Sequence, residues 1–151
     1  SNAAGAINLD YKKGEIMLID DHINLQGGSP LAFKGVEQLG SRFTDMSAPY
    51  DATMNTILKD VANTKGITLH QGVYVAVVGP QLIGADTVGM STVPEVIVAN
   101  HLSLPVVGLS VITDECNPND LEPVEISDIM EAAALAEPNM VVLFTELIKR
   151  L

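Results

Sequence analysis

The segment at 89–99, with the sequence GMSTVPEVIVA, constrains the fold of this chain more than any other segment. A short apolar run ends in a glycine, two hydroxyl residues follow, and a proline begins an amphipathic run. Thr92 and Glu95 have the spacing of a helix capping box, and Pro94 stands where a first helical turn tolerates proline. Such a turn points unpaired backbone N–H groups and hydroxyls at one place, which favours an anion. The segment therefore predicts a strand, a turn and a helix, and the turn either binds an anion or, like most capped helix starts, binds nothing.

Short apolar runs alternate with helical patterns along the rest of the chain. Strands are expected at 15–20, 67–70, 73–78, 87–90 and 106–113. Helices are expected after Ser47 and Pro49, at 94–100, and on both sides of Pro138, which either kinks one helix or starts the next. Because the strands are apolar throughout, their sheet must be covered by helices on both faces. These patterns predict an α/β fold.

Ligands of α/β sheets bind at the ends of strands, where the chain turns into loops or helices. The segments at 2–5, 89–92 and 113–114 have this character, and we expect them to converge on one cleft. Residues 24–48 contain several glycines and show little periodicity. A loop of this length inside a compact domain is typically functional or interfacial.

Composition limits the partners of the chain. Its 151 residues suit a single domain. The 19 acidic and 8 basic residues give a net charge of −11. A negative charge of this size disfavours nucleic acid and anionic membranes as partners. No apolar stretch reaches membrane-spanning length. The single cysteine, Cys116, excludes an internal disulfide and fits a reducing cytoplasm, and with three scattered histidines it predicts no metal site.

The remaining candidate residues each have a structural alternative. Asp21 and His22 are an acid–base pair or, as the alternative, a hydrogen-bonded loop. His70 stands beside an expected turn and is predicted to be solvated, whereas His101 follows a helix end, where a cation suits the dipole. Cys116 has no neighbour in the sequence that would activate it as a nucleophile.

Several blocks of the sequence resemble, in order, the family of trimeric purine nucleoside phosphorylases. They are NAAGAIN at 2–8, GEIMLI at 14–19, DHINL at 21–25, RFTDMSAPYD at 42–51, GVYVAVVGP at 72–80 and GADTVGMS at 84–91, which leads into the segment at 89–99. Together they cover most of residues 2–114. The resemblance implies the nucleoside phosphorylase fold, a mixed central sheet flanked by helices on both faces, represented here mostly by its C-terminal half.

In that family, inorganic phosphate attacks the anomeric carbon of a purine nucleoside and releases the free base and a pentose 1-phosphate. No other cofactor is implied. The resemblance implies that Ala3, through its backbone N–H, and Ser91, through its hydroxyl, bind phosphate. It also implies that Phe43 reaches the sugar pocket of a neighbouring subunit, so we expect a homotrimer.

The resemblance assigns the nucleoside itself to a second set of residues. Tyr74 and Met90 would contact the sugar, and Thr113 and Asp114 the purine, with Asp114 as the catalytic residue. Members that act on 6-oxopurines commonly carry Asn at position 114. An ionised Asp only accepts hydrogen bonds, so it suits a 6-amino group or a protonated N7 and would repel O6. Related methylthioadenosine phosphorylases carry Thr-Asp there, so both substrate classes stay open, as does a plain turn residue.

Two parts of the family pattern are absent from the sequence. The family's N-terminal half, which holds further phosphate ligands, has no counterpart before Asn2, and a loop with most of a helix is missing between Pro80 and Gln81. These are either true deletions or segments that the sequence omits. A true fragment is expected to expose strand edges. The alternative to an active phosphorylase is an inactive remnant that only binds purine or oligomerises.

Overall fold

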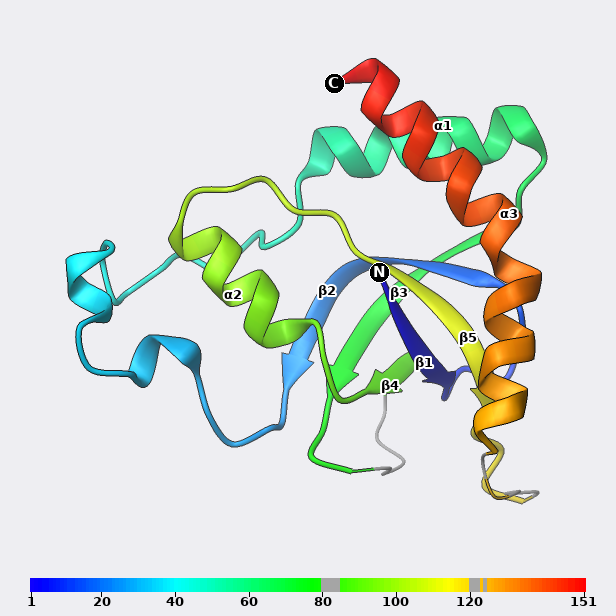
Figure 1. The fold of residues 1–151 in the computed structure, drawn as a ribbon, viewed down its shortest axis with the longest axis horizontal. Helices are drawn as coiled ribbons and strands as arrows, with labels where there is room; N and C mark the ends of the chain where they lie inside the picture. Colours follow the sequence, from blue (N-terminus) through cyan, green and yellow to red (C-terminus); the bar gives the residue numbers. More distant parts are fainter. Residues whose placement is uncertain (80–84, 120–122, 124) are drawn as a thin grey trace.

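The computed structural model describes residues 1–79, 85–119, 123 and 125–151 (Figure 1). The strands are β1 (Asn2–Ala6), β2 (Ile16–Asn24), β3 (Leu69–Ala76), β4 (Thr87–Gly89) and β5 (Leu109–Glu115). The α-helices are α1 (Ala52–Lys65), α2 (Val93–His101) and α3 (Ile126–Arg150), and two short 3₁₀ helices, η1 (Pro30–Ala32) and η2 (Val36–Gln38), lie in the long loop. The predicted junction between Pro80 and Gln81 lies outside the described residues.

The strands form one mixed sheet that closes on itself in the order β1-β4-β3-β2-β5. Strand β1 is parallel to β5 and antiparallel to β4, and β2 is parallel to β3 and antiparallel to β5. The mixed sheet predicted for the family is confirmed. In the described part of the chain, ring closure gives each strand a partner on both sides, although β2 pairs with β5 only at Ile16, Met17 and Leu18.

Both faces of the strands are apolar because each face packs against helices. One core cluster joins Met17 and Ile19 of β2 to Tyr74 of β3 and to α2. The alternate residues of β2, Ile16 and Leu18, belong to a second cluster with α1 and α3. In Figure 1, α1 and α3 lie together and α2 lies apart from them, which confirms the predicted helices on both faces.

Several element boundaries differ from the predicted ones for local reasons. Helix α1 begins after Asp51, whose carboxylate caps it by accepting from the Met54 N–H at 2.8 Å, and not at Ser47. Strand β5 begins at Leu109, three residues later than expected. Helix α3 continues through Pro138, so the proline interrupts neither the helix nor its apolar face.

Strand β3 is continuous where two strands were predicted, because Gly72 does not start a turn. A Cβ at Gly72 would lie 2.6 Å from Cγ of Asp86, and this carboxylate accepts from the Val73 N–H at 2.8 Å. Asp86 also accepts from the Asn8 side chain at 3.1 Å. The glycine is therefore needed for close approach of a side chain.

This contact gives a direct test of the fold. Gly72→Ala should lower the free energy of unfolding by about 1–3 kcal/mol, because the whole Asp86 side chain must move and leave its two partners. Gly28→Ala is the matched control, since nothing lies within 4 Å of a Cβ there. Urea denaturation of both variants measures the difference. Equal stabilities would contradict the Gly72–Asp86 packing.

Candidate functional site

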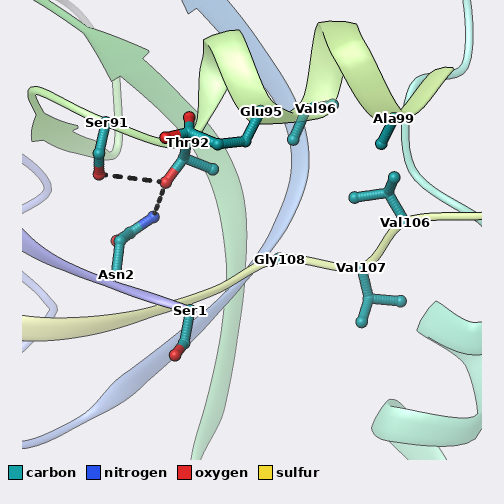
Figure 2. Close-up of a pocket in the computed structure, with 10 residues that line it drawn as sticks. All are labelled: Ser1, Asn2, Ser91, Thr92, Glu95, Val96, Ala99, Val106, Val107 and Gly108. Atoms are coloured by element: carbon teal, nitrogen blue, oxygen red, sulfur yellow. Dashed lines mark hydrogen bonds between the residues drawn. The ribbon is translucent and has the colours of Figure 1, made fainter. Parts of the chain in front are cut away.

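A pocket of about 320 Å³ opens between the start of β1, the turn before α2, α2 itself and the segment that leads into β5 (Figure 2). Its lining residues are Ser1, Asn2, Ser91, Thr92, Glu95, Val96, Ala99, Val106, Val107 and Gly108. Figure 2 shows that the hydroxyls of Ser91 and Thr92 gather with the Asn2 amide at one end, and that Val106 and Val107 lie at the other. The pocket therefore has a polar end and an apolar end.

The polar end is built on a γ-turn at Thr92. Thr92 has φ 74° and ψ −52°, and the Val93 N–H donates to the Ser91 carbonyl at 2.8 Å. A γ-turn with positive φ is rare and strained, particularly for a β-branched residue. The predicted capping box is wrong, because the Thr92 side chain makes no capping hydrogen bond. Pro94 does lie in the first turn of α2, as predicted.

Side chains from three directions hold this turn. The Asn2 amide donates to Thr92 Oγ1 at 2.7 Å, and the Gln26 amide donates to the Met90 carbonyl at 2.8 Å. The Ser91 N–H donates to the Tyr74 hydroxyl at 3.3 Å. A Cβ at position 89 would collide with the Tyr74 hydroxyl, so a glycine before the turn lets the tyrosine reach it. The resulting turn leaves the Ser91 side chain exposed.

A second polar group forms where β5 ends. The Thr113 hydroxyl lies 3.3 Å from the Ala4 carbonyl and donates to Asp114 Oδ1 at 2.8 Å. The Cys116 thiol donates to Asp114 Oδ2 at 3.4 Å. Gly5 lies directly beneath this carboxylate, since a Cβ there would fall 2.6 Å from Asp114 Oδ2. Burial, and then the Asp114 charge, raise the pKa of Cys116 to about 11.

Strand β1 connects the two polar groups. Asn2 contacts the turn, whereas Ala4 and Gly5 contact Thr113 and Asp114. Gly5 lies three positions after Asn2, which is roughly 10 Å along a strand. The segments at 2–5, 89–92 and 113–114 are thus joined through β1, but the lining of the pocket includes neither Thr113 nor Asp114.

The other predicted site residues lie in different surroundings. Ala3 is exposed in β1, and Met90 is 63% exposed beside the turn. Phe43 is 92% exposed in the long loop. Tyr74 has 0% exposure, and its hydroxyl is turned to the Ser91 N–H. Its predicted contact with sugar therefore stays a prediction.

The electrostatics of the pocket do not favour a highly charged anion. Among its ten lining residues, all within the described chain, Glu95 is the one charged side chain, and none is a lysine, arginine or histidine. An anion at the turn would be held by N–H and hydroxyl groups. Hydrogen bonds from neutral donors are weaker than charge-assisted ones, so such binding would be weak.

His22 and His70 make structural contacts. His22 Nδ1 lies 3.0 Å from the Tyr50 hydroxyl, and burial lowers the pKa of His22 even though Asp21 raises it. Asp21 accepts from the backbone N–H of His22 and does not pair with its ring. His70 stacks on Tyr11 at 4.2 Å between ring centroids and lies 2.6 Å from Glu15 Oε2, so the prediction of a solvated His70 is wrong.

Sequence patterns did not predict three features of the polar end of the pocket: the γ-turn, the Asn2–Thr92 hydrogen bond and the Gln26 contact. Asn2 lies in a quoted block, but its partner is 90 positions away and no local pattern shows it. Over the residues that the structure describes, no three His, Cys, Asp or Glu side chains gather as a metal site would require. In the same residues, no helix is both long and apolar enough to cross a membrane.

The family model described as the phosphorylase superfamily matches residues 1–149. The chain belongs to this superfamily. Purine nucleoside phosphorylase 1 of Bacillus subtilis is 39% identical over 142 residues, which are 87% of this chain and 52% of the relative. The Geobacillus stearothermophilus enzyme of the same name is 45% identical over 125 residues, or 76% of this chain and 46% of the relative. The chain spans about half the length of the curated relatives it matches.

Solved structures of the superfamily confirm the predicted fold. Schistosoma mansoni purine nucleoside phosphorylase in complex with adenosine superposes with a TM-score of 0.91 at 30% identity, over 99% of this chain and 60% of that chain. Its isoform 2, in complex with cytosine and ribose-1-phosphate, has a TM-score of 0.91 at 32% identity, over 99% and 59%. The resemblance of the sequence to purine nucleoside phosphorylases is therefore confirmed.

Burial of the Cys116 thiol, together with the nearby Asp114 charge, predicts an unreactive thiol. At pH 8, alkylation of Cys116 in the folded chain should be about 200-fold slower than in the urea-unfolded chain, because a pKa near 11 leaves little thiolate. Asp114→Asn should speed the folded reaction, since it removes the neighbouring charge. Iodoacetamide labelling followed by mass spectrometry measures both rates. Folded and unfolded chains that react equally fast would contradict this burial of the thiol.

Proposed function

We propose that this chain provides the phosphate- and purine-binding parts of a purine nucleoside phosphorylase. The reaction is phosphorolysis of purine ribonucleosides and deoxyribonucleosides to free base and pentose 1-phosphate, with inorganic phosphate as co-substrate and no other cofactor. Membership of the superfamily and curated relatives of this name support the proposal. The observation that carries it is the single strand β1, which contacts the Thr92 turn with Asn2 and the Asp114 carboxylate with Gly5.

Phosphate would bind at the polar end of the pocket. The Ser91 hydroxyl and the Ala3 N–H are its ligands in this proposal, and both residues are exposed. The turn presents Ser91 from a backbone that Tyr74 and Asn2 already hold, so little ordering is needed on binding. An oxygen of phosphate attacks the anomeric carbon as the bond to purine N9 breaks, and the electron pair leaves with the purine.

In this proposal the purine lies against the Asp114 carboxylate, which itself covers Gly5 because no Cβ keeps it away. Asp114 stabilises the departing base by accepting from a protonated N7, and the Thr113 hydroxyl holds the carboxylate in place at 2.8 Å. A carboxylate can also accept from a 6-amino group. For that reason a methylthioadenosine-type phosphorylase is the second candidate, behind an enzyme for 6-oxopurines.

The remaining predicted site residues would contact the sugar or take part in the assembly of subunits. In this proposal Met90, which is 63% exposed, contacts the pentose directly, and Tyr74, which is buried, contacts it once its hydroxyl leaves the Ser91 N–H. Phe43, which is 92% exposed, enters the sugar pocket of a neighbouring copy in a homotrimer in the cytoplasm. None of the described residues that line the pocket is a lysine, arginine or histidine, so cationic phosphate ligands would come from outside the pocket. Residues 1–151 form a single domain in this proposal, with a loop and helix missing between Pro80 and Gln81.

A turnover assay tests the proposal. The purified chain should release hypoxanthine from inosine only when inorganic phosphate is present. Ser91→Ala should raise the KM for phosphate at least about tenfold, because one hydrogen bond to the anion is lost. Ser127→Ala, at an exposed position near the start of α3, is the matched control and should leave the KM unchanged.

The same assay separates the alternatives. Faster release from methylthioadenosine than from inosine would favour the second candidate. Asp114→Asn should shift the preference toward inosine, because an amide can donate to O6. Hypoxanthine binding without any turnover would contradict the enzymatic proposal and leave the inactive remnant.

A further inference from the structure

Thr92 adopts a strained conformation exactly one residue after the proposed phosphate ligand. Its φ of 74° and ψ of −52° belong to a backbone region that costs on the order of 1–3 kcal/mol for a non-glycine residue. Such a conformation persists only where the surrounding structure determines it. The contacts of the Thr92 side chain are therefore informative, because they show what holds the turn.

Asn2 supplies the long-range contact to this side chain. Its amide Nδ2 donates to Thr92 Oγ1 at 2.7 Å, across 90 positions of sequence. Asn2 lies in β1 opposite Ser110 of β5, so its backbone is fixed by the barrel. Asn2 Oδ1 is buried without a partner, as is the hydroxyl of the fully buried Ser110. The strand pairing places these two polar groups at neighbouring positions, which suits one bridging water.

The hydrogen bond from Asn2 sets the direction of a short chain of hydroxyls. Ser91 Oγ lies 3.3 Å from Thr92 Oγ1, and either hydroxyl can be the donor in that pair. Asn2 occupies one of the two acceptor positions of Thr92 Oγ1, which favours the arrangement in which Thr92 donates its own hydrogen to Ser91. Ser91 then keeps its hydrogen for a ligand, and each bond polarises the next. Without the amide, both acceptor positions of Thr92 Oγ1 are open, so the reversed arrangement, with the Ser91 hydrogen turned away from the pocket, becomes more populated.

We propose that Asn2 is a positioning residue that fixes the Thr92 turn and directs the Ser91 hydroxyl hydrogen toward inorganic phosphate. The inference rests on the proposed function, since it assumes that phosphate binds at Ser91. Asn2 acts through Thr92 and Ser91 and need not touch the anion itself. This role requires a donor at position 2 and a hydroxyl at position 92, and it is independent of the methyl group of Thr92.

Titration of the whole chain with inorganic phosphate, followed by the Ser91 and Thr92 amide signals in NMR spectra, tests the inference. Asn2→Ala should weaken phosphate binding about tenfold, which corresponds to the loss of one oriented hydrogen bond. Thr92→Val should weaken binding equally, whereas Thr92→Ser should stay within about twofold of the unmodified chain. Asn8→Ala is the matched control, because it removes a part-buried amide bonded to Asp86 instead of the turn.

A double-mutant cycle separates positioning from a general loss of structure. If Asn2 acts through Ser91, then Asn2→Ala should add less than about twofold to the loss caused by Ser91→Ala. Losses that multiply, or phosphate binding by Asn2→Ala within about twofold of the unmodified chain, would overturn the inference and leave the proposed function intact. Absence of phosphate binding by the unmodified chain would instead overturn the proposed function, and the inference with it.

Discussion

Strand β1 pairs with β4 on one side and with β5 on the other, and the candidate site depends on this double pairing. Through β4 the strand is linked to the turn at Thr92, and through β5 to the Asp114 carboxylate. A register shift between Ala4 and Gly5 lets Asp114 lie over the glycine. The two polar groups are therefore held by one short, rigid element, and their spacing does not depend on a flexible loop.

Ring closure explains how these residues can form a core. The chain spans about half the length of its curated relatives, yet each described strand has a partner on both sides. Apolar side chains on alternate faces of β2 reach separate clusters, one with α2 and one with α1 and α3. This double pairing leaves less unpaired strand edge than an open sheet would, although the end of β2 pairs with β3 alone.

The sequence predicted the features that depend on local pattern or on family blocks. Apolar runs predicted the covered sheet, and Pro94 marked the first turn of α2. Local pattern gave wrong predictions where the conformation depends on a side chain that is distant in the sequence. Gly72 indicated a turn, but it lies within β3, where the Asp86 side chain approaches it closely. Thr92 indicated a capping box, but its hydroxyl accepts a hydrogen bond from Asn2 instead. The burial of Tyr74 likewise depends on the closed barrel, which no short window of sequence contains.

A crystal structure of the chain grown with inorganic phosphate and hypoxanthine tests the central claim most directly. The account predicts a tetrahedral anion within hydrogen-bond reach of the Ser91 hydroxyl, and a purine ring with an edge against Asp114. Both ligands should bind beside β1, one toward each end of the strand. Phosphate or purine found away from β1, or side chains packed between Ser91 and Asp114 so that the two ligands cannot meet, would contradict it.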